Sequence, residues 1–144
     1  MPITPPPLPR YYIVSLALGV NEQPLYLTQS GDQVVVHYQP SPSAIWHLVA
    51  ELGGQMIVNA QSGQALYGPF MSGQAVFMGQ ASPNPNSVWM YAHHTPFQTA
   101  LAPQDNFNVN LNVKGNSYPD GSQVVVFHWD GGYNSRWTIA PVTS

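Results

Sequence analysis

The chain has 144 residues, about the size of one domain, and its lack of cysteine excludes disulfides and thiolate metal sites. Only 6% of its residues are charged, against roughly 25% in an average soluble domain, so few side chains are available for acid–base chemistry. The formal net charge is −3 and the cations Arg10, Lys114 and Arg136 are not clustered, which argues against nucleic-acid and anionic-membrane partners.

Residues 1–10 are rich in proline and are expected to form an extended N-terminal strap, because each proline fixes φ and lacks a backbone donor. This segment has no apolar stretch of the kind found in a secretory signal. No part of the chain approaches the ~18 consecutive apolar residues of a membrane-spanning helix, so membrane insertion is not expected. We therefore expect a cytoplasmic protein, or one exported by a route that needs no signal peptide.

From Tyr11 onward the sequence consists of short β-prone runs separated by Gly, Pro, Asn and Ser, at intervals of about 8–12 residues. Fifteen Pro and twelve Gly leave no room for long helices. This pattern predicts an all-β sandwich or barrel. The expected strands include residues 11–18, 25–28, 33–38, 45–49, 55–59 and 123–129.

One segment occurs three times, which indicates a fold built from three copies of one unit. Its copies begin at Gln33, Gln74 and Gln123 and end at tryptophans that lie 43 and 48 residues apart. A closed β-propeller typically needs four to eight blades, whereas three units of about four strands fit a β-trefoil. We predict a single β-trefoil domain over residues 11–144, with units at about 11–52, 53–95 and 96–142. The tryptophans that end the copies are expected to be buried: Trp46, Trp89 and Trp137.

The carboxylates and histidines do not form a pattern typical of catalysis or metal binding. Asp32 and Asp120 lie beside glycines and are interpreted as turn residues. A glycosidase needs two carboxyl groups about 5–9 Å apart, and nothing in the sequence pairs any of them. His93-His94 has no Asp, Glu or Cys nearby to complete a zinc site. We therefore expect no enzyme activity, no metal and no cofactor.

The end of the second and third units resembles a known lectin motif. Asn86-Ser87-Val88-Trp89 and Asn134-Ser135-Arg136-Trp137 are similar to the Gln-x-Trp signature of ricin-B-type β-trefoil lectins, with Ser in place of Gln. The first unit reads Ser43-Ala44-Ile45-Trp46 and lacks the Asn. In its lack of cysteine and of a signal, the chain is most similar in character to the small cytoplasmic lectins of mushrooms.

The resemblance implies a sugar site in the third unit. In that family an early Asp accepts hydrogen bonds from sugar hydroxyls, an aromatic residue about fifteen positions later stacks on the ring, and an Asn lies three before the Trp. The matching positions are Asn112, Phe127 and Asn134, and Asn112 replaces the family's Asp. Beside them, His128, Trp129 and Asp130 are expected to add aromatic surface and one carboxylate.

The first two units match the family pattern less fully, and we rank them second and third. The first offers Tyr26, His37 and Ser43, with Tyr38 and Gln39 nearby, and the second offers Tyr67, Met78 and Asn86. The resemblance implies metal-free binding of galactose-type or N-acetylgalactosamine-type glycans. The expected partners are glycans or glycoproteins, with a homodimer left open.

A β-trefoil proteinase inhibitor is the alternative. Such proteins act through rigid surface loops, and residues 40–42 and 82–86 are stiffened by proline. An inhibitor of cysteine proteases would need no basic residue in its loop. A glycan array beside a protease panel would separate the two functions.

Overall fold

Twelve β-strands make up most of the regular structure of residues 7–143, the part of the chain that this computed structural model describes. Of the predicted strap, residues 1–6 lie outside the described part, and residues 7–10 have no regular secondary structure. No helix in the described part is long and apolar enough to cross a membrane. The strands are β1 (Tyr11–Ser15), β2 (Leu25–Ser30), β3 (Gln33–His37), β4 (Trp46–Glu51), β5 (Gly54–Asn59), β6 (Ala65–Tyr67), β7 (Phe77–Gly79), β8 (Val88–Ala92), β9 (Ala100–Pro103), β10 (Val109–Val113), β11 (Val124–His128) and β12 (Trp137–Pro141).

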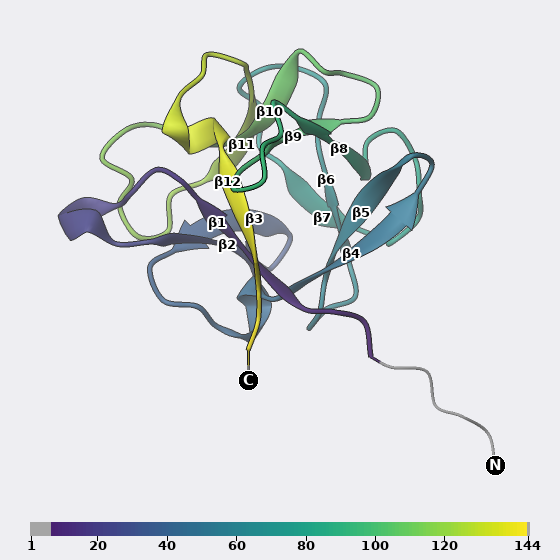
Figure 1. The fold of residues 1–144 in the computed structure, drawn as a ribbon, viewed down its shortest axis with the longest axis horizontal. Coiled ribbons are helices and arrows are strands. Elements are labelled where there is room, and N and C mark those ends of the chain that lie inside the picture. Colours follow the sequence, from purple (N-terminus) through teal and green to yellow (C-terminus); the bar gives the residue numbers. More distant parts are fainter. Residues whose placement is uncertain (1–6, 144) are drawn as a thin grey trace.

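Six of the strands form a closed barrel, in the order β1-β4-β5-β8-β9-β12. The last strand, β12, pairs antiparallel with β1 from Tyr11↔Pro141 to Ser15↔Trp137, so both ends of the described chain lie on the same side of the molecule (Figure 1). Thr99, just before β9, closes the ring by exchanging two backbone hydrogen bonds with Trp137, at 2.9 and 2.8 Å. Closure leaves no free edge in the barrel.

The other six strands form three hairpins, β2–β3, β6–β7 and β10–β11. The hairpins touch one another through the pair Gln33↔Phe77 and the bridges Val35↔Gln123 and Ala75↔Val125. Each unit therefore gives two strands to the barrel and one hairpin to the triplet that caps it: β1–β4 in unit one, β5–β8 in unit two and β9–β12 in unit three. This is the β-trefoil that the sequence repeat predicts.

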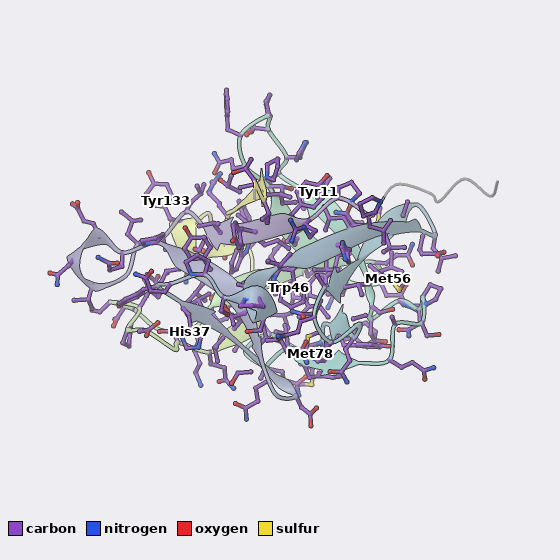
Figure 2. The ribbon with its side chains drawn as sticks, turned by 90° about the horizontal axis from the view of Figure 1, so that it is seen from below. Tyr11, His37, Trp46, Met56, Met78 and Tyr133 are labelled. Atoms are coloured by element: carbon purple, nitrogen blue, oxygen red, sulfur yellow. The ribbon has the colours of Figure 1, made fainter. Side chains whose placement is uncertain are left out.

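The three tryptophans occupy equivalent places in the core. Trp46, Trp89 and Trp137 are each 0% exposed, and Trp46 lies near the centre of the molecule in Figure 2. A buried indole N–H needs an acceptor. Each Nε1 donates to a leucine carbonyl on its own unit's hairpin, at 2.9, 2.9 and 3.0 Å respectively: those of Leu27, Leu66 and Leu111. The prediction of three buried, related rings is confirmed.

The barrel hairpins differ in the length of their turns. The β4–β5 turn has two residues, Leu52 and Gly53, with φ of 50° and 82°. Two positive φ values in succession are typical of the tight type I′ hairpin turn. The β8–β9 connection, which joins the next pair of neighbouring barrel strands, has seven residues, 93–99. Asp32 lies in the β2–β3 turn, as the sequence predicts.

Candidate functional site: a cleft in unit three

A cleft of about 260 Å³ opens on unit three, between the β10–β11 hairpin and the connection from β11 to β12. Four of the residues predicted for the unit-three site line it. Asn112 comes from β10, Phe127 from β11, and Asp130 and Asn134 from the β11–β12 connection. The fold therefore brings together side chains that are up to 22 positions apart in the sequence.

The floor of the cleft is a chain of hydrogen-bonded amides. Asn112 is 4% exposed, and its Nδ2 donates to Ser135 Oγ at 2.6 Å. Asn134 Nδ2 donates to the Val113 carbonyl at 3.0 Å and to Asn112 Oδ1 at 3.3 Å. These bonds fix the orientation of both side-chain amides, because each Nδ2 group already donates to an acceptor within the protein. The second lone pair of Asn112 Oδ1 and the oxygen of Asn134 remain as acceptors for a ligand.

Gly132 allows two polar groups to approach each other at the rim. Its backbone N–H donates to Asp130 Oδ1 at 2.8 Å. A Cβ on Gly132 would lie 2.7 Å from Asn134 Oδ1, closer than real Cβ atoms come, and 3.0 Å from Asp130 Oδ1, which is also a tight contact. The glycine therefore lets the carboxylate and the amide lie side by side.

The charges of the cleft balance. Lys114 and Asp130, of opposite charge, both line it. The pKa of the nearby Tyr118 phenol is raised above its ordinary value, mainly by burial and in second place by the negative charge of Asp130. Because the charges of Lys114 and Asp130 are opposite, the described lining of the cleft carries no net charge that would favour an anion or a cation.

The apolar wall of the cleft comes from β11. Phe127 is half-buried there, next to the buried Val125. His128 and Trp129, which were predicted to add aromatic surface, lie beside the cleft and do not line it. The backbone N–H of His128 donates to Ser72 Oγ at 3.0 Å. Trp129 is stacked on His93, with ring centroids 3.9 Å apart and planes 8° apart.

In unit one the structure corrects the predicted equivalence. In unit three, Trp137 Nε1 donates to the Leu111 carbonyl, and Asn112 is the next residue. In unit one, Trp46 Nε1 donates to the Leu27 carbonyl, so the residue after Leu27 occupies the place of Asn112. That residue is Thr28, and the match predicted for Tyr26 is wrong by two positions. Thr28 is buried and donates to the Tyr26 carbonyl at 2.8 Å. Unit one therefore has no amide at this place.

His37, Tyr38 and Gln39 do not form a comparable cleft. Tyr38 Oη donates to the Tyr118 carbonyl at 2.8 Å. His37 Nδ1 lies 3.0 Å from Asp120 Oδ1, which also accepts the Tyr38 backbone N–H at 2.9 Å. The bond from Tyr38, and then that from His37, hold the pKa of the Asp120 carboxyl below its usual range. Asp120 lies in a turn as expected, but it also links units one and three; Gln39 is exposed.

In unit two a tyrosine fills the corresponding space. In unit three the aromatic residue Phe127 pairs with Asn110, two residues before Asn112. The corresponding pair of β6 and β7 is Ala65↔Gly79, so Gly79, and not the predicted Met78, occupies the place of the aromatic residue. The Tyr67 ring lies over Gly79, 3.0 Å from where a Cβ would be, and stacks on Phe77 with centroids 5.4 Å apart. Asn86 Nδ2 donates to a backbone carbonyl at 3.2 Å, as Asn134 does in unit three. Unit two keeps the scaffold of the cleft but not its opening.

Several residues of the cleft were not found from the sequence. Lys114 and Gly115 follow β10 and line one side, while Gly73 approaches from the β6–β7 connection of unit two. Ser135, which stands at the place of the motif's Gln, fixes the floor although it is 0% exposed. The pairing Ala75↔Val125 that brings unit two close has no sequence signal, because it depends on how hairpins from different units meet.

No protein-family model matches the sequence, and a search of curated proteins gives no match. Solved structures share the fold. The designed threefold-symmetric protein ThreeFoil matches with a TM-score of 0.79 at 22% identity, over 92% of this chain and 99% of that chain. The Macrolepiota procera ricin B-like lectin in complex with lactose matches with a TM-score of 0.75 at 17% identity, over 95% and 99%.

The C-half of the earthworm R-type lectin in complex with GalNAc matches with a TM-score of 0.69 at 16% identity, over 93% of this chain and 99% of that chain. At these identities the likeness concerns the fold. The chain has a β-trefoil fold, in agreement with its closed barrel and three capping hairpins.

Proposed function

We propose that this protein is a lectin, whose unit-three cleft binds a terminal galactose-type or N-acetylgalactosamine-type residue of a glycan without metal. The observation that carries the proposal is the convergence of Asn112, Phe127, Asp130 and Asn134 on one cleft of about 260 Å³. A pyranose presents an apolar C–H face and rims of hydroxyl groups. An aromatic wall beside fixed polar groups, with no net charge, suits both surfaces.

Each side chain has a distinct role in this proposal. Phe127 contacts the apolar face of the sugar. Asn112 Oδ1 and Asn134 Oδ1 accept hydrogen bonds from hydroxyl groups, and the Asp130 carboxylate accepts a charge-assisted one. Asp130 thus supplies the charge that the lectin family has at the place of Asn112. Of the described residues, Asp130 alone brings a carboxylate to the cleft, and glycoside hydrolysis needs a pair of them, so we propose binding without catalysis.

The sugar preference rests on the likeness to the two lectins. One was solved with lactose and the other with GalNAc, and both share the fold over nearly their whole length. A shared fold by itself specifies no ligand, because function depends on the residues of the site. The cleft geometry supports a neutral sugar, and the choice of galactose-type sugars is the part of the proposal that a glycan array tests most directly.

The test is a calorimetric titration of monovalent galactose, N-acetylgalactosamine and lactose into folded variants. Asn134→Ala and Asp130→Ala each remove one polar group, which should weaken affinity roughly tenfold to a hundredfold. Asn108→Ala and Asp105→Ala are matched controls, because both residues are exposed and lie outside the cleft. A monovalent sugar is needed since avidity would hide part of the loss.

Three results would contradict the proposal. The unit-three assignment fails if the two site variants titrate like the parent protein. The sugar assignment fails if an array shows binding of mannose alone or sialic acid alone. The metal-free part fails if EDTA abolishes binding, although no group of three or more His, Asp or Glu side chains suited to a metal occurs among residues 7–143.

The inhibitor alternative is supported by the loop of residues 82–86. Ser87 Oγ donates to the Ser82 carbonyl at 2.6 Å and accepts the Asn84 backbone N–H at 3.0 Å. The loop is exposed at Ser82 and Pro83 and is therefore both rigid and accessible, as an inhibitory loop must be. A panel of cysteine and serine proteases, assayed with the protein in micromolar excess, tests it. Inhibition in the absence of any sugar binding would replace the lectin proposal.

A further inference from the structure

A second and larger cleft, of about 390 Å³, lies outside the repeated sites. It opens between the β8–β9 connection and the barrel strands β1, β4 and β12. Its lining includes Tyr11, Tyr91, Phe97, Gln98 and Thr138. The cleft is not one of three equivalent positions, because the β4–β5 turn, the counterpart of the β8–β9 connection in the preceding barrel hairpin, has only two residues.

The connection that forms this cleft is longer than the fold requires and is held in one shape. Thr95 and Gln98 close a turn, with the Thr95 N–H donating to the Gln98 carbonyl at 2.8 Å and the Gln98 N–H donating to Thr95 Oγ1 at 3.2 Å. Thr138 Oγ1 on β12 donates to the Phe97 carbonyl at 3.2 Å and so ties the turn to the barrel. A connection that is both long and fixed lowers the cost of ordering on binding and is typical of a functional loop.

The cleft presents aromatic surface to solvent. Phe97 is 83% exposed, the highest value among the large apolar side chains of the described chain. Tyr91 is also exposed, and His94 is stacked on it with ring centroids 4.9 Å apart and planes 9° apart. Exposed apolar surface that is gathered in one place is typical of an interaction site. Among residues 7–143, no Asp, Glu, Lys or Arg lines the cleft, so the lining offers no permanently charged side chain to a charged ligand.

Gln98 offers hydrogen bonds that the described part of the protein does not use. Its side-chain oxygen is buried, and within residues 7–143 no donor reaches it. A buried carbonyl without a donor is unfavourable, and rotation about the terminal bond of a glutamine meets only a low barrier. A ligand hydroxyl in the cleft would supply the missing donor once the amide turns toward it.

We propose that this cleft is a second site for a neutral saccharide ring, separate from the three repeat positions. The sugar stacks on the exposed aromatic surface of Tyr91 and Phe97, and the Gln98 amide bonds its hydroxyl groups. The class of ligand rests on the proposed lectin function, because aromatic rings, an amide and no net charge are the same chemistry as in the unit-three cleft. The site itself rests on the geometry of the β8–β9 connection.

An NMR titration of the ¹⁵N-labelled protein with monovalent sugars separates the two sites. Galactose, N-acetylgalactosamine, lactose, glucose and mannose are each added to saturation. We expect backbone amides of residues 93–99 to shift with their own dissociation constant, distinct from that of residues 112–134. Gln98→Ala and Phe97→Ala should each weaken the first set roughly tenfold and leave the second set unchanged. Phe107→Ala is the matched control, since this ring is exposed and lies outside both clefts.

Every result of this titration decides between the proposals. Saturable shifts at 112–134 alone would overturn the second site and leave the lectin proposal standing. Shifts at 93–99 alone would overturn the unit-three site, and no saturable shift with any sugar would overturn both. If the amides of 93–99 shift with protein concentration when no sugar is present, the aromatic surface is covered by a second copy of the chain, and the saccharide site is wrong.

Discussion

Replacing each core tryptophan by phenylalanine should destabilise the protein by a similar amount in all three units. The change leaves the buried carbonyl that the indole contacts without a donor, which costs about 1–3 kcal/mol. The smaller ring adds about 1 kcal/mol for the cavity, so each variant should lose roughly 2–4 kcal/mol. Domains of this size are usually stable by about 5–15 kcal/mol, so the variants should still fold. Removing the whole ring, as in Trp137→Ala, should cost about 3–5 kcal/mol.

Urea unfolding followed by circular dichroism measures these losses, and the fourth tryptophan provides the control. Trp129 is only half-buried; its ring stacks on His93, and the Arg136 guanidinium lies 5.0 Å from the ring centroid. Trp129→Phe should therefore cost less than about 1 kcal/mol. If Trp46→Phe, Trp89→Phe or Trp137→Phe costs no more than this control, the indole bond to the hairpin does not stabilise the fold.

Two further predictions concern the site and the link between units. Gly132→Ala should keep the fold, because its φ of −68° suits alanine, but it should weaken sugar binding at least tenfold by displacing Asn134; unchanged titration would show that the rim is not part of the site. The Asp120 carboxylate has a lowered pKa, so its stabilising effect is present above the unfolded value of about 3.9 and lost as pH falls through the folded value. Asp120→Asn should therefore flatten the fall in urea midpoint between pH 5 and pH 2.5, and an unchanged profile would assign that fall to other groups.

The fold could be predicted from the sequence because its repeat is carried by large residues at fixed spacing. Each unit must bury one indole ring and pair its N–H, and each does so in the same way with Trp46, Trp89 or Trp137, whose N–H bonds a leucine carbonyl of the unit's hairpin. The exact register was harder to predict. Tyr26 and Thr28 lie on the same face of β2, so alternation cannot separate a correct match from one displaced by two.

The site could be predicted only where its residues follow the motif in sequence. Asn112 and Asn134 were found in this way, and the structure places them in hydrogen-bond contact. Adjacent residues on a strand face opposite sides, so the run from Phe127 to Trp129 could not all face one cleft. The contribution of Gly73 depends on the neighbouring unit, and the closing of unit two by Tyr67 depends on a ring packing over a glycine. Such contacts between distant segments leave no local signal.

The pairing of β1 with β12 has a consequence for biosynthesis. On the ribosome β1 emerges before every other strand and β12 after all of them, so the barrel can close only when translation of the domain is nearly complete. Until then β1 lacks its main partner and exposes an unpaired edge. The hairpins β2–β3 and β4–β5 join neighbouring strands and can form early, whereas closure must wait for contacts between the two ends. The nascent chain is therefore most open to misassembly just before Trp137 reaches Thr99.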